Sequence, residues 1–148
     1  MFKGSELIAV SHFTAPGDDL GDRLEFIRNK VISLIKEYDI DEVVFEDIQL
    51  QDVHGNKETG IKTFKILAEV FGVIHELLNE LDIEYTIVPP IVWKATFKIA
   101  GKGRSQEKKM AQAWVLNAYG LKCTEDEADA ACIGSHIIKK QSVEFDWS

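Results

Sequence analysis

Several features are scarce in this sequence of 148 residues, and each absence removes a class of protein. The two cysteines, Cys123 and Cys132, are too few for a disulfide framework and have no second Cys or His pair at zinc-site spacing. No apolar run is long enough to span a bilayer, and the residues after Met1 do not resemble a signal peptide. We therefore expect a reduced, intracellular protein that is not inserted in a membrane.

Positive charge is also scarce overall. The formal net charge is −8 at pH 7, which argues against a general nucleic-acid binder. One segment, residues 94–109, nevertheless contains a single acid and is rich in basic residues, namely Lys94, Lys98, Lys102, Arg104, Lys108 and Lys109. A basic segment on an acidic chain fits local contact with a phosphate backbone. A solvated loop and helix face is the alternative interpretation, and the sequence leaves both open.

The order of hydrophobic segments and turn residues predicts alternating strands and helices. The chain is long enough for one domain with its own core, and it contains no repeat or linker. Strands are expected at Leu7–Phe13, Val43–Glu46 and Tyr85–Val88, and helices at about 19–38, 61–81, 90–97, 105–119 and 124–140, the fourth capped by Ser105. This order predicts an α/β fold with a partly parallel sheet.

The stretch from Thr124 to Gly134 is the most informative part of the chain. Thr124 and Glu127 have the spacing of a capping box, so a helix is expected to start there. Asp126 and Asp129 are then three residues apart, on one face of that helix. Two adjacent carboxylates suit a hard cation such as Mg²⁺. Acids in a first helical turn are also favoured by the helix dipole alone, with no metal involved.

A third candidate acid follows an apolar run far upstream. Val43, Val44 and Phe45 are apolar without alternation, as in a strand covered on both faces, and Glu46 ends that run. A carboxylate at the end of a buried strand, opposite a helix that carries two more, would suit metal-assisted phosphodiester hydrolysis. A rim carboxylate with no metal is the alternative for Glu46. For His136, on the same helix face as Asp129, a rim position is favoured over a metal ligand.

Taken in chain order, four segments resemble the RuvC-type Holliday-junction resolvases of the ribonuclease-H-like superfamily. The likeness is greatest to the small versions carried by phages of low-GC Gram-positive bacteria. The segments are Val43–Glu46, Pro89–Lys94, Gly101–Gln112 and Asp126–Ala131. Each motif is weak alone, and their common order makes the resemblance specific.

The resemblance implies a single ribonuclease-H-like nuclease domain over residues 1–148, with a mixed sheet flanked by helices. It implies a Mg²⁺-dependent endonuclease for four-way (Holliday) or other branched DNA, with Mn²⁺ as a substitute metal. Carried over residue by residue, Glu46, Asp126 and Asp129 are the expected catalytic and metal-binding acids. Lys94 and Lys108 match basic residues that contact DNA, and the rest of the segment 94–109 would add contacts.

The resemblance also implies an assembly and a location. A four-way junction has two-fold symmetry, so paired cuts need two active sites and a homodimer is expected. The helix expected at 61–81 is a candidate for the interface, and plain core is the alternative for its apolar face. The cytoplasm of a bacterial or phage-infected cell is the expected location.

One part of the family's pattern has no counterpart in this sequence. The family's first catalytic acid lies on an opening strand with an Ile-Asp sequence, whereas Leu7–Phe13 looks like the third strand. Asp18, Asp19 and Asp22 follow at a helix start and are poor substitutes. We therefore expect a shortened form of the domain. The alternative functions are a catalytically inactive junction- or DNA-binding module and an acidic α/β protein with no nucleic-acid role.

Overall fold

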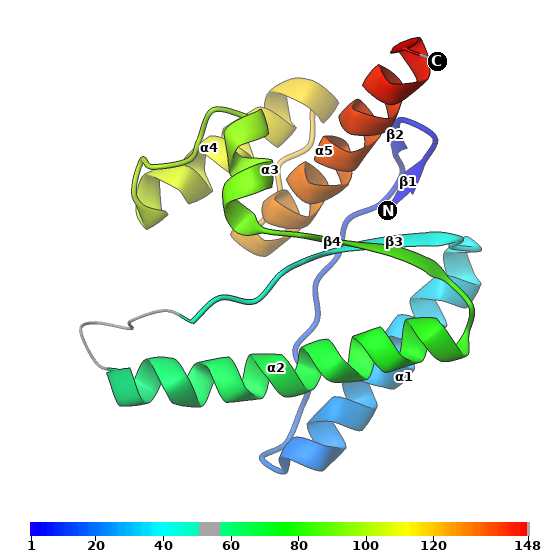
Figure 1. Ribbon diagram of the computed structural model, residues 1–148, viewed down its shortest axis with the longest axis vertical. Helices are drawn as coiled ribbons and strands as arrows, with labels where there is room; N and C mark the ends of the chain where they lie inside the picture. Colours follow the sequence, from blue (N-terminus) through cyan, green and yellow to red (C-terminus); the bar gives the residue numbers. More distant parts are fainter. Residues whose placement is uncertain (51–56, 148) are drawn as a thin grey trace. The chain divides into compact units, whose positions relative to one another are not determined.

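A computed structural model describes residues 1–50 and 57–147 of the chain (Figure 1). Its helices are α1 (Leu20–Tyr38), α2 (Lys57–Glu80), α3 (Pro90–Thr96), α4 (Arg104–Tyr119) and α5 (Glu125–Trp147). Its strands are β1 (Phe2–Lys3), β2 (Glu6–Leu7), β3 (Glu42–Glu46) and β4 (Glu84–Val88). The strands form two small sheets, β1 with β2 and β3 with β4. The helix α2 connects β3 to β4, which is the kind of crossover that joins parallel strands.

The chain divides into two compact units. Unit 1 comprises Met1–Phe13, Val44–Glu46 and Ile87–Ser148, and unit 2 comprises Thr14–Val43 and Asp47–Thr86. Both β3 and β4 therefore begin in unit 2 and end in unit 1. All the candidate site residues belong to unit 1. The expectation of one nuclease domain over the whole chain stays a prediction.

Unit 2 is built on the packing of α1 against α2. The helix α1 begins where the sequence predicts, because the side chain of Asp19 accepts a hydrogen bond from the backbone N–H of Asp22 at 2.9 Å. It ends at Asp39, whose φ of 50° stops the helical run. Arg28 of α1 pairs with Glu80 of α2. Leu77 and Leu78 of α2 are fully buried.

Unit 1 has its core between α3, α4 and α5, which lie together in Figure 1. Small side chains let α4 and α5 approach closely, because Ala111 and Ala128 are fully buried at their contact. Around this contact lie larger side chains that are also fully buried or nearly so, namely Trp93, Ile99, Val115 and Cys132. Burial raises the pKa of the Cys132 thiol to about 12, so it is an inert core residue.

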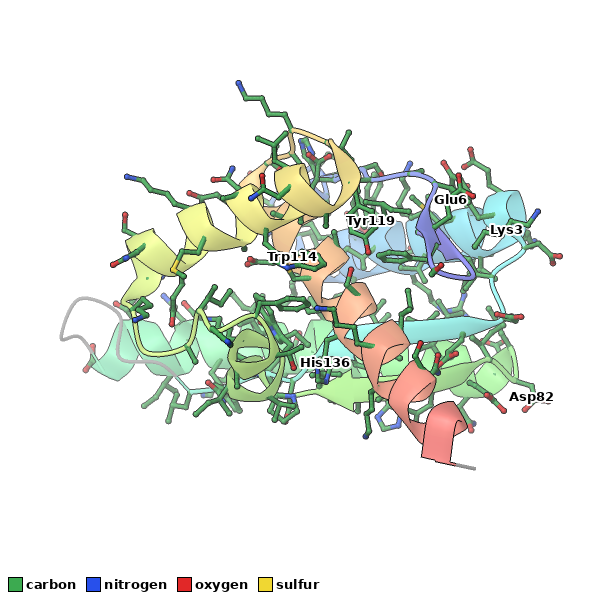
Figure 2. The ribbon with its side chains drawn as sticks, turned by 90° about the horizontal axis from the view of Figure 1, so that it is seen from above. Lys3, Glu6, Asp82, Trp114, Tyr119 and His136 are labelled. Atoms are coloured by element: carbon green, nitrogen blue, oxygen red, sulfur yellow. The ribbon has the colours of Figure 1, made fainter. Side chains whose placement is uncertain are left out.

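The rim of this core is aromatic. Trp114 and Tyr119 of α4 meet edge to face, and Phe97 lies against Trp114 with ring centroids 4.3 Å apart. Figure 2 labels Trp114, Tyr119 and His136, the last on α5. The hydroxyl of Thr96 lies 2.7 Å from Nδ1 of His136, and burial lowers the pKa of this histidine. The His136 side chain is therefore buried at the edge of the core, beside the exposed Thr96, and the rim position favoured for it stays a prediction.

The strand predicted at Leu7–Phe13 is also wrong. The observed β2 ends at Leu7, and β1 is its sole strand partner within the described part of the chain, with Phe2 opposite Leu7 and Lys3 opposite Glu6. Strand formation depends on a partner strand as much as on local apolar sequence. Since β1 is two residues long, residues 8–13 continue outside any strand.

Helix boundaries differ from the predictions at three places. The helix α2 begins at Lys57 rather than 61, and α5 continues to Trp147 rather than ending near Lys140. Ser105 is not the cap of α4, because the helix begins one residue earlier behind Gly103, whose φ of 89° separates the loop from the helix. The polar sequence of Gln49–Gly60 predicts a loop, and residues 51–56 of this segment lie outside the described residues. No helix in the described ranges is both long and apolar enough to cross a membrane.

Candidate active site

Glu46 stands where the sequence placed it, as the last residue of β3. Its side chain is exposed but not free to rotate, because Oε2 accepts a hydrogen bond of 2.6 Å from the indole N–H of Trp93. Trp93 follows β4 by way of Pro90, which starts α3 at a position where its missing N–H costs nothing. This hydrogen bond joins the exits of β3 and β4.

Asp129 lies on α5, whose start is fixed by the predicted capping box. The N–H of Glu127 donates to the Thr124 hydroxyl at 3.2 Å, and the N–H of Thr124 donates to the Glu127 carboxylate at 2.9 Å. Asp126 is thereby in the first turn, exposed, while Asp129 is one turn further and its side chain is 31% exposed.

The three predicted acids interact electrostatically. Burial raises the pKa of Asp129, and the negative charges of Glu46 and Asp126 raise it further. The positive charges of Lys108 and Lys94 act in the opposite direction. The net shift is upward, so desolvation and like charge outweigh the two lysines. The structure thus brings the three candidate acids near two of the lysines predicted to contact DNA, Lys94 and Lys108.

Lys108 lies between two acids of α5. Its ammonium nitrogen is 3.3 Å from Oε2 of Glu125 and 4.0 Å from Oδ2 of Asp129. The lysine side chain is 22% exposed, so α4 holds it partly out of water beside the candidate acids. The ammonium group of Lys108 is therefore placed to bind an anionic group, such as a phosphate, beside Asp129.

Lys94 is fixed by an acid that the sequence analysis did not single out. Its Nζ lies 3.4 Å from Oε2 of Glu107, and Oε1 of Glu107 accepts the backbone N–H of Gly101 at 3.1 Å. The Glu107 side chain is only 15% exposed. It therefore ties Lys94 of α3 to the start of the basic loop 101–103.

The other predicted DNA contacts are exposed and apart from the acids. These are Lys98, Lys102, Arg104 and Lys109. In the ranges 1–50 and 57–147, none of the four forms an ion pair. Lys98 and the two loop glycines have positive φ, and so the backbone turns sharply on both sides of Lys102.

Sequence reasoning missed Trp93, Glu107 and Glu125. Trp93 lies within a segment singled out only for its likeness, and its polar N–H beside Lys94 was the available signal. Glu107 is the one acid in the segment 94–109, and an acid in the first turn of a helix is a recognised capping signal. The hydrogen-bond partners of Trp93 and Glu107 depend on the tertiary fold, which the local sequence does not reveal.

The donor set suits a hard divalent cation, since Glu46, Asp126 and Asp129 offer carboxylate oxygens, and burial together with like charge raises the pKa of Asp129. The positions of these side chains support a metal site less strongly than their donor atoms do. Among the residues that the structure describes, no three His, Cys, Asp or Glu side chains lie close enough together to hold a metal ion. The acids are electrostatic neighbours rather than a formed coordination shell.

Comparison with known proteins gives a structural likeness only. No family model and no curated protein matches the sequence. The structure is similar to that of Thermus thermophilus RuvC, with a TM-score of 0.63 and 16% identity over 87% of this chain and 74% of that chain. It is also similar to T. thermophilus RuvC in complex with Holliday junction substrate, with a TM-score of 0.60, 12% identity and the same coverage of 87% and 74%.

The chain has a RuvC-like fold. This confirms the α/β class and the fold likeness expected from the sequence, while a larger mixed sheet stays a prediction. At 16% and 12% identity the comparison establishes the fold alone. In this RuvC-like fold the exit of β3 and the first turns of α5 carry the candidate acids.

Proposed function

We propose that this protein is a divalent-metal-dependent endonuclease that cuts four-way or other branched DNA. The observation that carries the proposal is the setting of Asp129, a half-buried carboxylate beside Glu46 and Asp126 and flanked by two lysines. The RuvC-like fold supports it, and one RuvC of this fold was solved in complex with Holliday junction substrate. The junction complex of that RuvC supports branched DNA as the proposed substrate class.

Glu46, Asp126 and Asp129 would hold the cation, Mg²⁺ or Mn²⁺, because they supply the hard oxygen donors that these ions prefer. When bound, such ions activate water for attack and stabilise the leaving oxygen of a phosphodiester. The residues of the chain then have defined tasks. Glu46 and Asp129 would present their carboxylates to the site from β3 and α5, with Asp129 partly buried beside Lys108.

The lysines would hold the DNA backbone beside these acids. Lys94 and Lys108 neutralise phosphate charge at the site, while Lys98, Lys102, Arg104 and Lys109 extend the contact outward along the loop 101–103 and α4. This division fits the observed exposure, since the two inner lysines are 29% and 22% exposed and the outer residues face solvent.

The proposal includes a homodimer and the rest of the expected organisation. The helix α2 exposes large apolar side chains at Ile61, Ile66 and Leu67, which makes it the candidate interface. The closer likeness to the small resolvases of phages, the single nuclease domain and the location in a bacterial or phage-infected cell belong to the same proposal.

A second candidate is a module that binds junctions without cutting them. The arrangement of the acids favours it, because the described residues bring no three potential ligands within reach of one ion. This module would keep salt-sensitive junction binding and show no cleavage at any Mg²⁺ or Mn²⁺ concentration.

The deciding experiment is cleavage of a labelled four-way junction with Mg²⁺ by the full chain, by Glu46→Gln and by Asp129→Asn. Glu25→Gln, an exposed acid of α1, is the matched control. Symmetric cuts that persist in the control and disappear in the two site variants support the nuclease. Tight junction binding without cuts supports the binding module. Equal affinity for the junction and plain duplex would contradict both proposals.

Metal binding can be measured separately from cleavage. Because the charges of the acids oppose one another in the absence of an ion, Mg²⁺ should raise the melting temperature of the wild-type chain. The increase should be absent in Asp129→Asn and unchanged in Glu25→Gln. A melting curve of the wild type that does not respond to Mg²⁺ would mean that the three acids do not form a cation site.

A further inference from the structure

The indole of Trp93 is a buried polar group whose hydrogen bond requires an explanation. The residue is 1% exposed and packs in the core of unit 1 with Ile99, Val115 and Cys132. An indole N–H can only donate, and a buried one without an acceptor would be destabilising. The chain provides the acceptor from β3, 47 residues earlier, as a carboxylate rather than a backbone carbonyl.

That acceptor is Glu46, an exposed residue. An exposed glutamate normally samples several rotamers, whereas a 2.6 Å hydrogen bond from a fully packed ring holds one of them. Oε2 is the bonded oxygen. Among the residues that the structure describes, no hydrogen bond to Oε1 is present, so this second oxygen remains available to a ligand.

The chemistry of the donor suits the support of a metal ligand. An indole N–H has no net charge to neutralise the carboxylate and no lone pair to compete for a cation. Lys94, the residue after Trp93, pairs instead with Glu107 at 3.4 Å. The negative charge of Glu46 contributes to the raised pKa of Asp129 across the site.

From these contacts we infer that Trp93 is a positioning residue, which orients the Glu46 carboxylate for a divalent cation. This inference rests on the proposed function, since it needs the cation site to exist. Outer hydrogen bonds to metal-ligating carboxylates typically change metal affinity by about 10–100-fold. A tryptophan that served only the core would affect stability and leave metal affinity unchanged.

Isothermal titration of the full chain with Mn²⁺ tests the inference. Trp93→Phe keeps an aromatic ring in the core and removes the N–H, and Trp114→Phe is the matched control at the aromatic rim. We expect Trp93→Phe to weaken Mn²⁺ binding by about 10–100-fold and the control to match the wild type. Equal affinity in a folded Trp93→Phe protein would overturn the positioning role and leave the cation site intact. Absence of Mn²⁺ binding by the wild type would instead overturn the proposed site, and the inference with it.

A fluorescence measurement keeps the test decisive if Trp93→Phe does not fold. The double variant Trp114→Phe/Trp147→Phe leaves Trp93 as the single tryptophan of the chain. Saturating Mg²⁺ should change the emission of Trp93, because its bonded partner becomes a ligand. Adding Glu46→Ala should change the emission without metal and abolish the response to Mg²⁺. Emission that ignores Mg²⁺ in a protein that binds it by calorimetry would overturn the inference.

Discussion

Glu107 joins two cationic segments of unit 1, since one carboxylate oxygen lies 3.4 Å from Nζ of Lys94 and the other accepts the N–H of Gly101 at 3.1 Å. The carboxylate is only 15% exposed and the lysine 29%, so the pair is partly shielded from water. Partial shielding from water strengthens the attraction between the two charges relative to a fully exposed pair. The pair with Glu107 fixes Lys94, the lysine that α3 contributes to the candidate site.

A double-mutant cycle should measure this pairing. Lys94→Ala and Glu107→Ala are each expected to destabilise the protein, with a coupling free energy of about 0.5–1 kcal/mol from urea denaturation, because each removes the partner of the other. Lys102→Ala with Glu107→Ala is the control cycle, since Lys102 is exposed and forms no ion pair within the described residues. A coupling as large in the control would show that the effect is general electrostatics.

Asp129 should make the stability of the metal-free protein depend on pH. Burial and the Glu46 charge raise its pKa in the folded state, so the ionised carboxylate destabilises the fold above that pKa. The cost disappears as the pH falls through the folded pKa, because the folded state binds the proton more tightly than the unfolded chain. Asp129→Asn should therefore melt at a higher temperature than the wild type near neutral pH, and the difference should shrink in acid.

Thermal melting between about pH 4 and pH 8 without divalent ions checks this expectation. Glu25→Gln, on the exposed side of α1, should follow the wild-type curve across the range. If Asp129→Asn melted below the wild type at neutral pH, the attraction of Lys108 at 4.0 Å would outweigh burial, and the direction assigned to the pKa shift would be wrong.

Lys108 should contribute one phosphate contact to junction binding. Each neutralised phosphate releases condensed counterions, and losing one contact lowers the slope of log K against log salt by about 0.9. Lys108→Ala is expected to show this reduction in a binding titration at several salt concentrations without divalent ions. Lys36→Ala, an exposed lysine in the last turn of α1, should keep the wild-type slope. An unchanged slope in Lys108→Ala would remove this residue from the proposed DNA contact.

Local signals explain which parts of the fold were predictable. The Asp19 cap, the end of β3 at Glu46, the Pro90 start of α3 and the Thr124–Glu127 capping box all depend on residues within one turn or one strand. The failed strand at Leu7–Phe13 depended on a partner strand, which is a tertiary property. The sequence could show which segments form, but not which of them pair.

The same distinction applies to the candidate site. The acids Glu46, Asp126 and Asp129 were found because residue type, spacing and element position are visible in the sequence. The Trp93 indole was not, because its acceptor lies 47 residues away and only packing brings the two together. The metal-binding and DNA-binding roles of all these residues stay predictions until the experiments above are done.

Gly134 offers a test of how the N-terminal hairpin packs on α5. A Cβ at this position would clash with Cε2 of Phe2, whose ring also meets Tyr119 edge to face. Gly134→Ala should therefore destabilise the protein through overpacking by about 1–3 kcal/mol, reduced by the roughly 1 kcal/mol that alanine gains over glycine in a helix. Urea denaturation gives the net value.

The sign should reverse when the ring is removed. In a Phe2→Ala background nothing opposes the added methyl group, so Gly134→Ala should stabilise by about 0.5–1 kcal/mol through helix propensity alone. Gly72→Ala on α2 is the matched control, since a Cβ there meets no described atom within 4 Å, and it should stabilise either background equally. If Gly134→Ala destabilised the Phe2→Ala protein as much as the wild type, the hairpin would not be packed on α5 through this ring.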